Sequence, residues 1–264
     1  MLSLPDKAVI ACVHLPPTPG SPGYQGKIDD IYTSALTDAE IFLRHGVDAL
    51  IVENFRDAPF HPGPVPAETT ATIAAVTREI VRMSPVATGV AVLRNDASAA
   101  LAIATATGAA FIRVNVHVGA VLSEQGIVTG NSHETLRLRR TLQSDVAILA
   151  DARVKHSQPL AYTNLASEVR DLSQRADGII VSGELTGLET SPQDLLTARK
   201  AGTGPLFVGS GVTPHNLPAV YEHADGFIVG SYCKTDGVPG NPVDESRVDH
   251  LMAAMRALRE NRHP

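Results

Sequence analysis

One pattern occurs twice near the end of the chain, first as Leu206-Phe207-Val208-Gly209-Ser210-Gly211 and then as Phe227-Ile228-Val229-Gly230-Ser231. In each copy a short apolar run, typical of a buried strand, ends in a Gly-Ser pair. Glycine lets the backbone approach an anion, and the N–H groups of a following helix or turn point at it. The two copies predict the last two units of a β/α barrel, with a phosphate-type anion site at their ends. The alternative is two tight turns that only need glycine.

The same alternation of a short apolar run and a longer helical pattern extends back through the chain. The predicted strands are Ala8–Leu15, Ala49–Phe55, Val86–Leu93, Phe111–Val116, Val146–Ala150, Gly178–Ser182, Leu206–Gly209 and Phe227–Gly230. The predicted helices are Ile28–His45, Ala67–Met83, Ala97–Thr107, Glu134–Leu142, Leu160–Arg175, Pro192–Ala201, Pro214–Glu222 and Glu245–Glu260. Nearly continuous apolar runs are typical of strands buried on both faces, and regular alternation with helices predicts parallel strands.

Eight such units can close into a barrel or lie open as a doubly wound sheet. An open sheet usually carries a glycine-rich dinucleotide loop after its first strand, but here that strand ends in His14-Leu15-Pro16-Pro17. The length of 264 residues suits one barrel, for which about 250 is typical. We therefore predict a single-domain (β/α)8 TIM barrel of the phosphate-binding type over residues 1–264. Its first strand spans about 8–15, its eighth about 226–231, and its last helix about 245–260.

Composition narrows the classes of function. The net charge is −6, without the clustered basic residues of a nucleic-acid-binding surface. The first residues lack the pattern of a signal peptide, so none is expected, and no apolar run reaches the roughly 18 residues of a membrane span. We expect a cytoplasmic protein that forms homo-oligomers and acts on a small molecule, with no nucleic-acid partner and no membrane insertion. Cys12 and Cys233 are expected to be free thiols.

The active sites of such barrels form at the carboxyl ends of the strands. The catalytic candidates there are Glu53, Asp151 and Lys155. Two carboxylates in a partly desolvated mouth can take different pKa values, so that one acts as acid and the other as base. Each can instead cap a helix or pair with Lys155 or Arg113. Lys155 itself can form a Schiff base, pair with Asp151 or contact a second phosphate.

Polar residues at the remaining strand ends are candidate ligand-binding groups. The substrate-binding candidates are His14, Asn54, Asp57, Arg94, Asn95, Asn115, His156 and Ser182. The phosphate-binding candidates are Gly183, Gly209, Ser210, Gly211, Gly230 and Ser231, with Lys234 just beyond them as a further anion ligand. Asparagine also favours turns, which is the alternative for the three asparagines.

The spacing of potential metal ligands assigns no residue to a metal. Neither an HExxH nor a Cys-x-x-Cys pattern is present, so a structural zinc site is not expected. No cofactor is assigned. Mg²⁺ or Mn²⁺ held by Glu53, Asp57 or Asp151 stays open.

Several of these segments together resemble one family. They are Val13–Pro22, Gly46–Phe55, Val92–Ala97, Phe111–Val116 and Val208–Val212, and with similar segments between them they resemble the BtpA/SgcQ family over almost the whole chain. The resemblance implies a TIM-like barrel but no settled activity. The family is named for a factor needed for photosystem I biogenesis, and other members are encoded with sugar-metabolism genes. The layout is also similar to the tryptophan synthase α subunit, which implies an acid/base role for Glu53.

Two hypotheses of function follow. The first is an enzyme acting on a phosphorylated sugar or a nucleoside- or nucleotide-like molecule, with acid/base chemistry by Glu53 and Asp151. Hydrolysis of an N-glycosidic bond is the leading reaction, and a lyase or isomerase needs the same acid and base. The second is a non-catalytic assembly or stability factor, as the family name implies.

Overall fold

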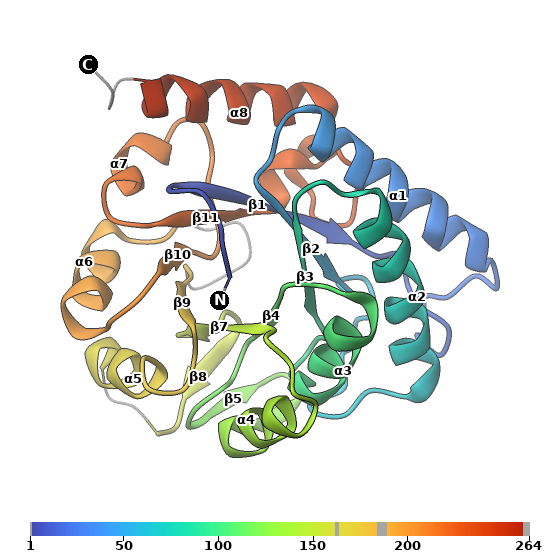
Figure 1. Cartoon of the computed structure of the whole chain (residues 1–264), viewed down its shortest axis with the longest axis horizontal. Helices are drawn as coiled ribbons and strands as arrows, with labels where there is room; N and C mark the ends of the chain where they lie inside the picture. The colour runs from blue at the N-terminus through green and yellow to red at the C-terminus, as the bar shows by residue number, and fades with distance from the viewer. Residues whose placement is uncertain (1, 162–163, 184–188, 261–264) are drawn as a thin grey trace.

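Eight parallel strands form a closed barrel surrounded by helices in the computed structural model, which describes residues 2–161, 164–183 and 189–260 (Figure 1). The barrel strands are β1 (Ala8–His14), β2 (Ala49–Glu53), β3 (Ala87–Ala91), β4 (Phe111–Val114), β7 (Ala147–Ala152), β9 (Gly178–Val181), β10 (Leu206–Val208) and β11 (Gly226–Val229). The helices around them are α1 (Ile28–Arg44), α2 (Ala67–Met83), α3 (Ala97–Thr107), α4 (Ser132–Thr141), α5 (Leu165–Leu172), α6 (Pro192–Ala201), α7 (Leu217–Tyr221) and α8 (Glu245–Glu260). The predicted TIM barrel is confirmed, with β1 pairing with both β2 and β11.

Each barrel strand divides its side chains between two apolar layers. Along β1, Val9, Ala11 and Val13 belong to the layer between strands and helices, whereas Ile10 and Cys12 belong to the layer inside the barrel. This alternation follows from the two-residue period of a strand. It decides which side chains reach the mouth of the barrel.

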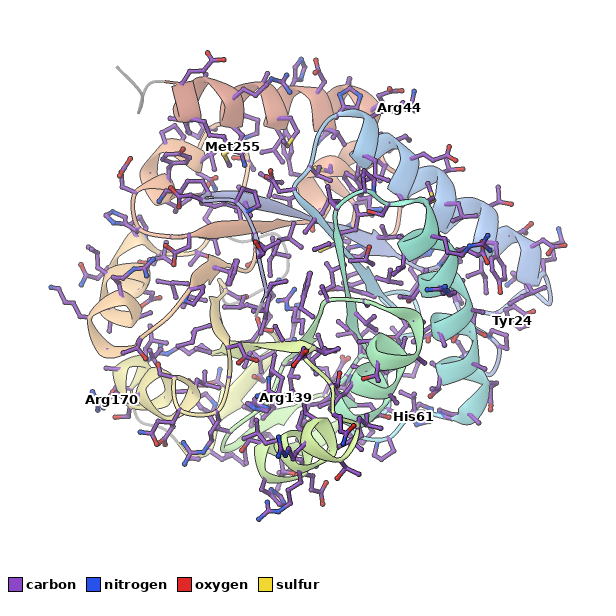
Figure 2. The ribbon with its side chains drawn as sticks, in the orientation of Figure 1. Tyr24, Arg44, His61, Arg139, Arg170 and Met255 are labelled. Atoms are coloured by element: carbon purple, nitrogen blue, oxygen red, sulfur yellow. The ribbon has the colours of Figure 1, made fainter. Side chains whose placement is uncertain are left out.

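The helices present apolar side chains inward and charged ones outward. Met255 of α8 is fully buried against the strands, while Arg44 and Arg170 lie on the outer rim of the ring of helices (Figure 2). No described helix is both long and apolar enough to cross a lipid bilayer.

Aromatic rings fill the middle of the barrel, and glycines on neighbouring strands leave room for them. A Cβ atom on Gly89 of β3 would overlap the ring of Phe111, and one on Gly226 would lie 2.8 Å from the ring of Phe207. Leu2 packs against the same inner layer and helps to close the amino end of the barrel. The predicted site residues lie at the opposite, carboxyl end of the strands.

A second, three-stranded sheet lies beside the mouth and was not predicted. Its strands are β5 (Ala120–Ser123), β6 (Gly126–Thr129) and β8 (Ser157–Pro159), in the order β6-β5-β8. Val121 and Val128 of its inner face pack with Val116 and Val154, which follow β4 and β7. The sheet thus covers the side of the mouth between these two barrel strands.

The predicted start of the helix over Leu160–Arg175 is wrong. Leu160 follows β8, and its N–H donates to the carbonyl of Ala120 at 2.8 Å. Helix α5 begins at Leu165 because the side chain of Asn164 caps it, accepting from the N–H of Ser167 at 2.9 Å. The helix predicted to begin at Pro214 likewise begins later, at Leu217.

The prediction that Lys234 binds an anion is also wrong. Lys234 is fully buried after the short 3-10 helix η1 (Ser231–Cys233), and its Nζ lies 2.6 Å from Oδ2 of Asp38 in α1. The other oxygen of Asp38 accepts from the N–H of Val243 at 3.0 Å. This ion pair fastens the loop after β11 to α1.

We expect Lys234→Ala to reduce the free energy of unfolding by about 3–5 kcal/mol, because it leaves the Asp38 carboxylate buried without its partner. Urea unfolding followed by circular dichroism measures the change. The matched control is Lys200→Ala at an exposed position of α6, which should stay within about 0.5 kcal/mol of the parent protein. Equal midpoints for the two variants would contradict this account of Lys234.

Candidate active site

On four strands, the side chains that face into the barrel change from apolar to polar at the mouth. β1 contributes His14, β2 contributes Glu53, β4 contributes Arg113 and β7 contributes Asp151, and all four side chains are buried. His14 and Glu53 are also direct neighbours in the register of β1 and β2. Titratable groups from strands far apart in the sequence therefore meet in one layer.

Asp151 is held by three neighbours. Arg113 donates from Nε and Nη2 to its two oxygens at 2.8 and 2.9 Å, Asn115 donates from Nδ2 at 3.0 Å, and the Ser182 hydroxyl donates at 3.2 Å. Burial acts to raise the pKa of Asp151, but the charge and hydrogen bonds of Arg113 outweigh it and lower the pKa below its ordinary value. Asp151 is thus ionised, and both its oxygens are engaged.

Glu53 is bonded far more loosely. Its Oε1 lies 3.5 Å from Nη1 of Arg113, and its Oε2 lies 3.8 Å from Nε2 of His14. Burial raises the pKa of Glu53, and the positive charges of Arg113 and Lys155 only partly oppose this. The pKa values of Glu53 and Asp151 are therefore shifted in opposite directions.

His14 has a fixed ring and a fixed tautomer. Its Nδ1 lies 2.9 Å from the carbonyl oxygen of Pro239, so the proton sits on Nδ1 and donates to that oxygen. The ring stacks on Phe55 with centroids 4.2 Å apart. Burial, followed by the charge of Lys234, lowers the pKa of His14 to about 3. The imidazole is therefore neutral, with its Nε2 lone pair directed to the Glu53 side.

Lys155 lies in the loop after β7 and reaches across to β10. Its Nζ donates to the carbonyl of Gly209 at 3.2 Å. Burial, together with the charge of Arg113, lowers the pKa of Lys155 to about 8. The lysine therefore stands beside the predicted anion site and exchanges its proton near neutral pH.

The end of the mouth next to β10 and β11 holds a cavity of about 50 Å³. Its lining consists of Cys12, His14, Glu53, Phe55, Arg113, Lys155, Gly209, Ser210, Gly211, Ile228, Gly230 and Ser231. Ser231 opens the 3-10 helix η1, and a short extra helix after the eighth strand often forms part of a phosphate site in this fold.

Two of the predicted phosphate-binding glycines use their N–H groups within the protein. The N–H of Gly209 donates to the carbonyl of Val181 at 2.8 Å, and that of Gly183 donates to Oγ of Ser210 at 3.1 Å. A Cβ atom on Gly209 would also overlap the Ser182 hydroxyl, which explains this glycine by packing. An anion would therefore be held mainly near Gly211, Gly230 and Ser231.

A second cavity, of about 220 Å³, adjoins the first and shares Glu53, Phe55, Arg113 and Lys155 with it. Its further lining consists of Phe60, Leu93, Arg94, Asn115, Glu124, Gln125, Val154 and His156. Three predicted substrate-binding residues are thus brought together here. Glu124 and Gln125 come from the β5–β6 turn and were not among the predicted site residues.

Asn54, Asp57 and Asn95 are engaged with the loops around the mouth. Asp57 accepts from the N–H and hydroxyl of Thr18 at 2.7 and 2.8 Å. Asn54 donates to Asp57 at 3.0 Å and accepts from the N–H of Leu93 at 2.7 Å. Asn95 bonds in the same way to the backbone after β4. These contacts fit the alternative in which such residues shape turns.

Cys12 is a further functional candidate that the sequence analysis did not select. The signal was available, because Ile10, Cys12 and His14 share the inward face of β1. Other hollows, beside Leu2 at the amino ends of the strands, are lined by none of the predicted site residues.

The closed barrel, with polar strand ends and a short helix after the last strand, defines a TIM barrel with a polar cavity at its carboxyl end. Solved structures share this fold. Tryptophan synthase of Mycobacterium tuberculosis matches with a TM-score of 0.61 at 15% identity, over 95% of this chain and 93% of that one. N-(5'-phosphoribosyl)anthranilate isomerase of Pyrococcus furiosus matches with a TM-score of 0.59 at 18% identity, over 95% and 99%.

The chain belongs to the BtpA family, whose model matches residues 5–257. It is 42% identical over 250 residues to the photosystem I biogenesis protein BtpA of Synechocystis, covering 94% of this chain and 87% of that protein. It is also 40% identical over 257 residues to an uncharacterised protein of Pyrococcus horikoshii, covering 97% and 98%. The family resemblance of the sequence is confirmed.

We expect Asp151→Asn to destabilise the protein by about 3 kcal/mol at pH 7, because Arg113 loses its charged partner inside the mouth. The folded-state pKa of Asp151 is lowered, so the stability it provides is complete above its unfolded pKa of about 3.9 and disappears as the pH falls through the folded value. Urea unfolding across a pH series measures this. Asp145→Asn, at an exposed position, is the matched control and should show no such dependence. A difference that persists unchanged at low pH would refute the assignment.

Proposed function

We propose that this protein is an enzyme acting on a phosphorylated small molecule, a sugar phosphate or a nucleotide-like ligand, by proton transfer at the barrel mouth. The observation that supports this most directly is convergence on one cavity. Glu53, Lys155 and the Gly-Ser ends of β10 and β11 all line it. A proton donor, a proton acceptor and a candidate anion site are thus within reach of one small ligand.

The two adjoining cavities suggest how the ligand lies. Its phosphate would sit near Gly211 and Ser231, and its other end would extend into the larger cavity. Arg94, Asn115 and His156 line that cavity and would bond hydroxyl groups or a base edge. The reacting atoms would then lie near the shared residues. Relatives by fold, whose names include a phosphoribosylanthranilate isomerase and a thiamine phosphate pyrophosphorylase, support a phosphorylated ligand.

Glu53 and Lys155 are the better acid/base pair. The pKa of Glu53 is raised and that of Lys155 is lowered to about 8, so both move towards neutral pH, where proton transfer is most effective. Asp151 is poorly placed to activate water because Arg113, Asn115 and Ser182 occupy its oxygens. Hydrolysis of an N-glycosidic bond by two carboxylates needs a carboxylate whose oxygens are free to activate water. An isomerase or lyase reaction is therefore our first choice and glycosidic cleavage the second.

A role in assembly is the second candidate function. It is supported by the 42% identity to a protein named for photosystem I biogenesis. The outer face of the three-stranded sheet exposes Leu122, Ile127 and Leu160 to 49%, 63% and 55%, which would suit a protein contact. In that case the mouth would bind a ligand without turning it over.

We expect phosphorylated sugars and nucleosides to raise the melting temperature of the protein, and their unphosphorylated forms to leave it unchanged, because the phosphate binds near Gly211 and Ser231. Thermal-shift assays with matched pairs of compounds measure this. Crystals soaked in sulfate should show the anion at the same place. Stabilisation by both forms alike, or an anion bound elsewhere, would argue against the phosphate site.

We expect Glu53→Gln and Lys155→Met each to lower kcat on the identified substrate by about 10²-fold or more, since each removes one proton-transfer group. Exposed matched controls are Glu79→Gln and Lys200→Met, which should retain the parent activity. In the parent protein kcat/KM should rise with pH through about 8, because Lys155 accepts a proton only when neutral. Full turnover by both site variants would exclude the acid/base pair.

A further inference from the structure

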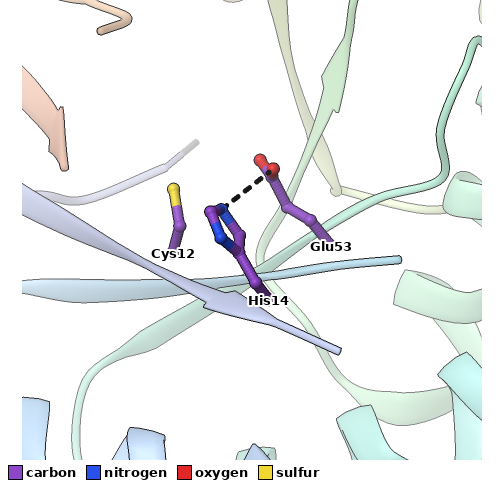
Figure 3. Close-up of side chains that lie close together, drawn as sticks. All are labelled: Cys12, His14 and Glu53. Atoms are coloured by element: carbon purple, nitrogen blue, oxygen red, sulfur yellow. Dashed lines mark ion pairs between the residues drawn. The ribbon is translucent and has the colours of Figure 1, made fainter. Parts of the chain in front are cut away.

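Cys12, His14 and Glu53 bring a thiol, an imidazole and a carboxylate together in the mouth (Figure 3). One ligating atom from each lies within 4.8 Å of the other two, and Nε2 of His14 and Oε2 of Glu53 are 3.8 Å apart. Among the described residues this is the one group of three with such spacing. We propose that these side chains bind a divalent transition-metal ion, zinc in the first instance.

The placement of the three ligands follows from strand geometry. Cys12 and His14 are successive inward residues of β1, and Glu53 is the register partner of His14 on β2. Two paired strands of a closed barrel therefore carry all three ligands. Ligands on rigid strands keep their geometry better than ligands on loops.

His14 is prepared as a metal ligand. Its Nδ1–H donates to the Pro239 carbonyl, the kind of second bond that metal-bound histidines usually make. That bond leaves the Nε2 lone pair available on the side of Glu53, and stacking on Phe55 fixes the ring plane. Glu53 similarly has Oε1 near Arg113 and Oε2 on the side of His14.

The donor set indicates which ion fits. Sulfur and nitrogen ligands favour Zn²⁺ over Mg²⁺, which prefers oxygen. Three protein ligands that leave a fourth position open are typical of catalytic zinc sites, and all three line the 50 Å³ cavity. Of the three carboxylates considered for Mg²⁺ or Mn²⁺, two are otherwise engaged, since Asp57 accepts from Thr18 and Asp151 from Arg113.

The charges of the site balance when the ion binds. Cys12 releases its thiol proton to solvent and forms the sulfur–metal bond, while Glu53 binds as a carboxylate. These two negative charges offset the two positive charges of the ion. Arg113 is already neutralised by its bidentate pair with Asp151.

The metal site does not depend on the proposed function. With the ion bound, Glu53 would be a ligand and not the proton donor, and the ion would supply Lewis-acid chemistry in the cavity beside Lys155. Binding itself can be measured without any substrate.

The test uses untagged, chelator-treated protein to which Zn²⁺ or Co²⁺ is added. We expect one equivalent of zinc per chain by elemental analysis after desalting. The cobalt form should show the visible bands of a four-coordinate ion and a thiolate-to-cobalt charge-transfer band in the near ultraviolet. Cys12→Ser should lose the charge-transfer band and weaken zinc binding by more than about 100-fold. This loss exceeds the one that is typical when a residue that only hydrogen-bonds to a metal ligand is replaced.

Cys233→Ser is the matched control, because Cys233 is the other buried free thiol and lies in the outer apolar layer. It should keep the stoichiometry and the spectrum. Absence of the thiolate band in the parent protein, or equal zinc affinity of the parent and Cys12→Ser proteins, overturns the proposal. If Cys12→Ser does not fold, the spectra of the parent and Cys233→Ser proteins still test the proposal. The chain has only two thiols, so a thiolate band that persists in Cys233→Ser must come from Cys12.

The outcomes separate the two proposals. Stabilisation by phosphorylated ligands without zinc binding would overturn the metal site and leave the proposed function standing. Zinc binding without a response to any phosphorylated ligand would support the metal site and count against the proposed function.

Discussion

A strand in a closed parallel barrel must direct every second side chain into the interior, and this constraint arranges the whole site. Lower in the barrel the inward positions hold Ile10, Phe111 and Phe207, which fill the space tightly. At the carboxyl ends the same faces carry charged residues. The tight apolar layer beneath them excludes water on one side, so the charges interact in a partly desolvated mouth, where their pKa values shift strongly.

Within that layer Arg113 determines the state of both carboxylates. It binds Asp151 through two short hydrogen bonds and Glu53 through one long contact. The strong pair fixes one negative charge, while the weak contact leaves Glu53 with a raised pKa. Arg113 thus lowers the pKa of Asp151 below its ordinary value, whereas burial keeps the pKa of Glu53 raised.

The sequence predicted the barrel well, because each strand is a nearly continuous apolar run and each ends in recognisable polar residues. Glu53 and Asp151 were placed at the mouth by that reasoning alone. The three-stranded sheet was not predicted because its strands are short. Its buried residues Val121 and Val128 are also buried only by packing against the residues that follow β4 and β7. The ion pair of Lys234 was not predicted because its partner, Asp38, lies 196 positions away in the chain. The proximity of Cys12 to Glu53 needed the pairing of β1 with β2, which is a property of the fold.

The bond between His14 and Pro239 links positions 225 residues apart. The loop that carries Pro239 begins at Lys234. At the base of this loop the backbone of Lys234 pairs with Val243, and its side chain bonds to Asp38 of α1. Contacts of such long sequence separation form only after the intervening chain is organised. A chain without this loop lacks the carbonyl group that accepts from Nδ1 of His14. The orientation of His14 therefore depends on one of the last contacts that we expect the folding chain to make.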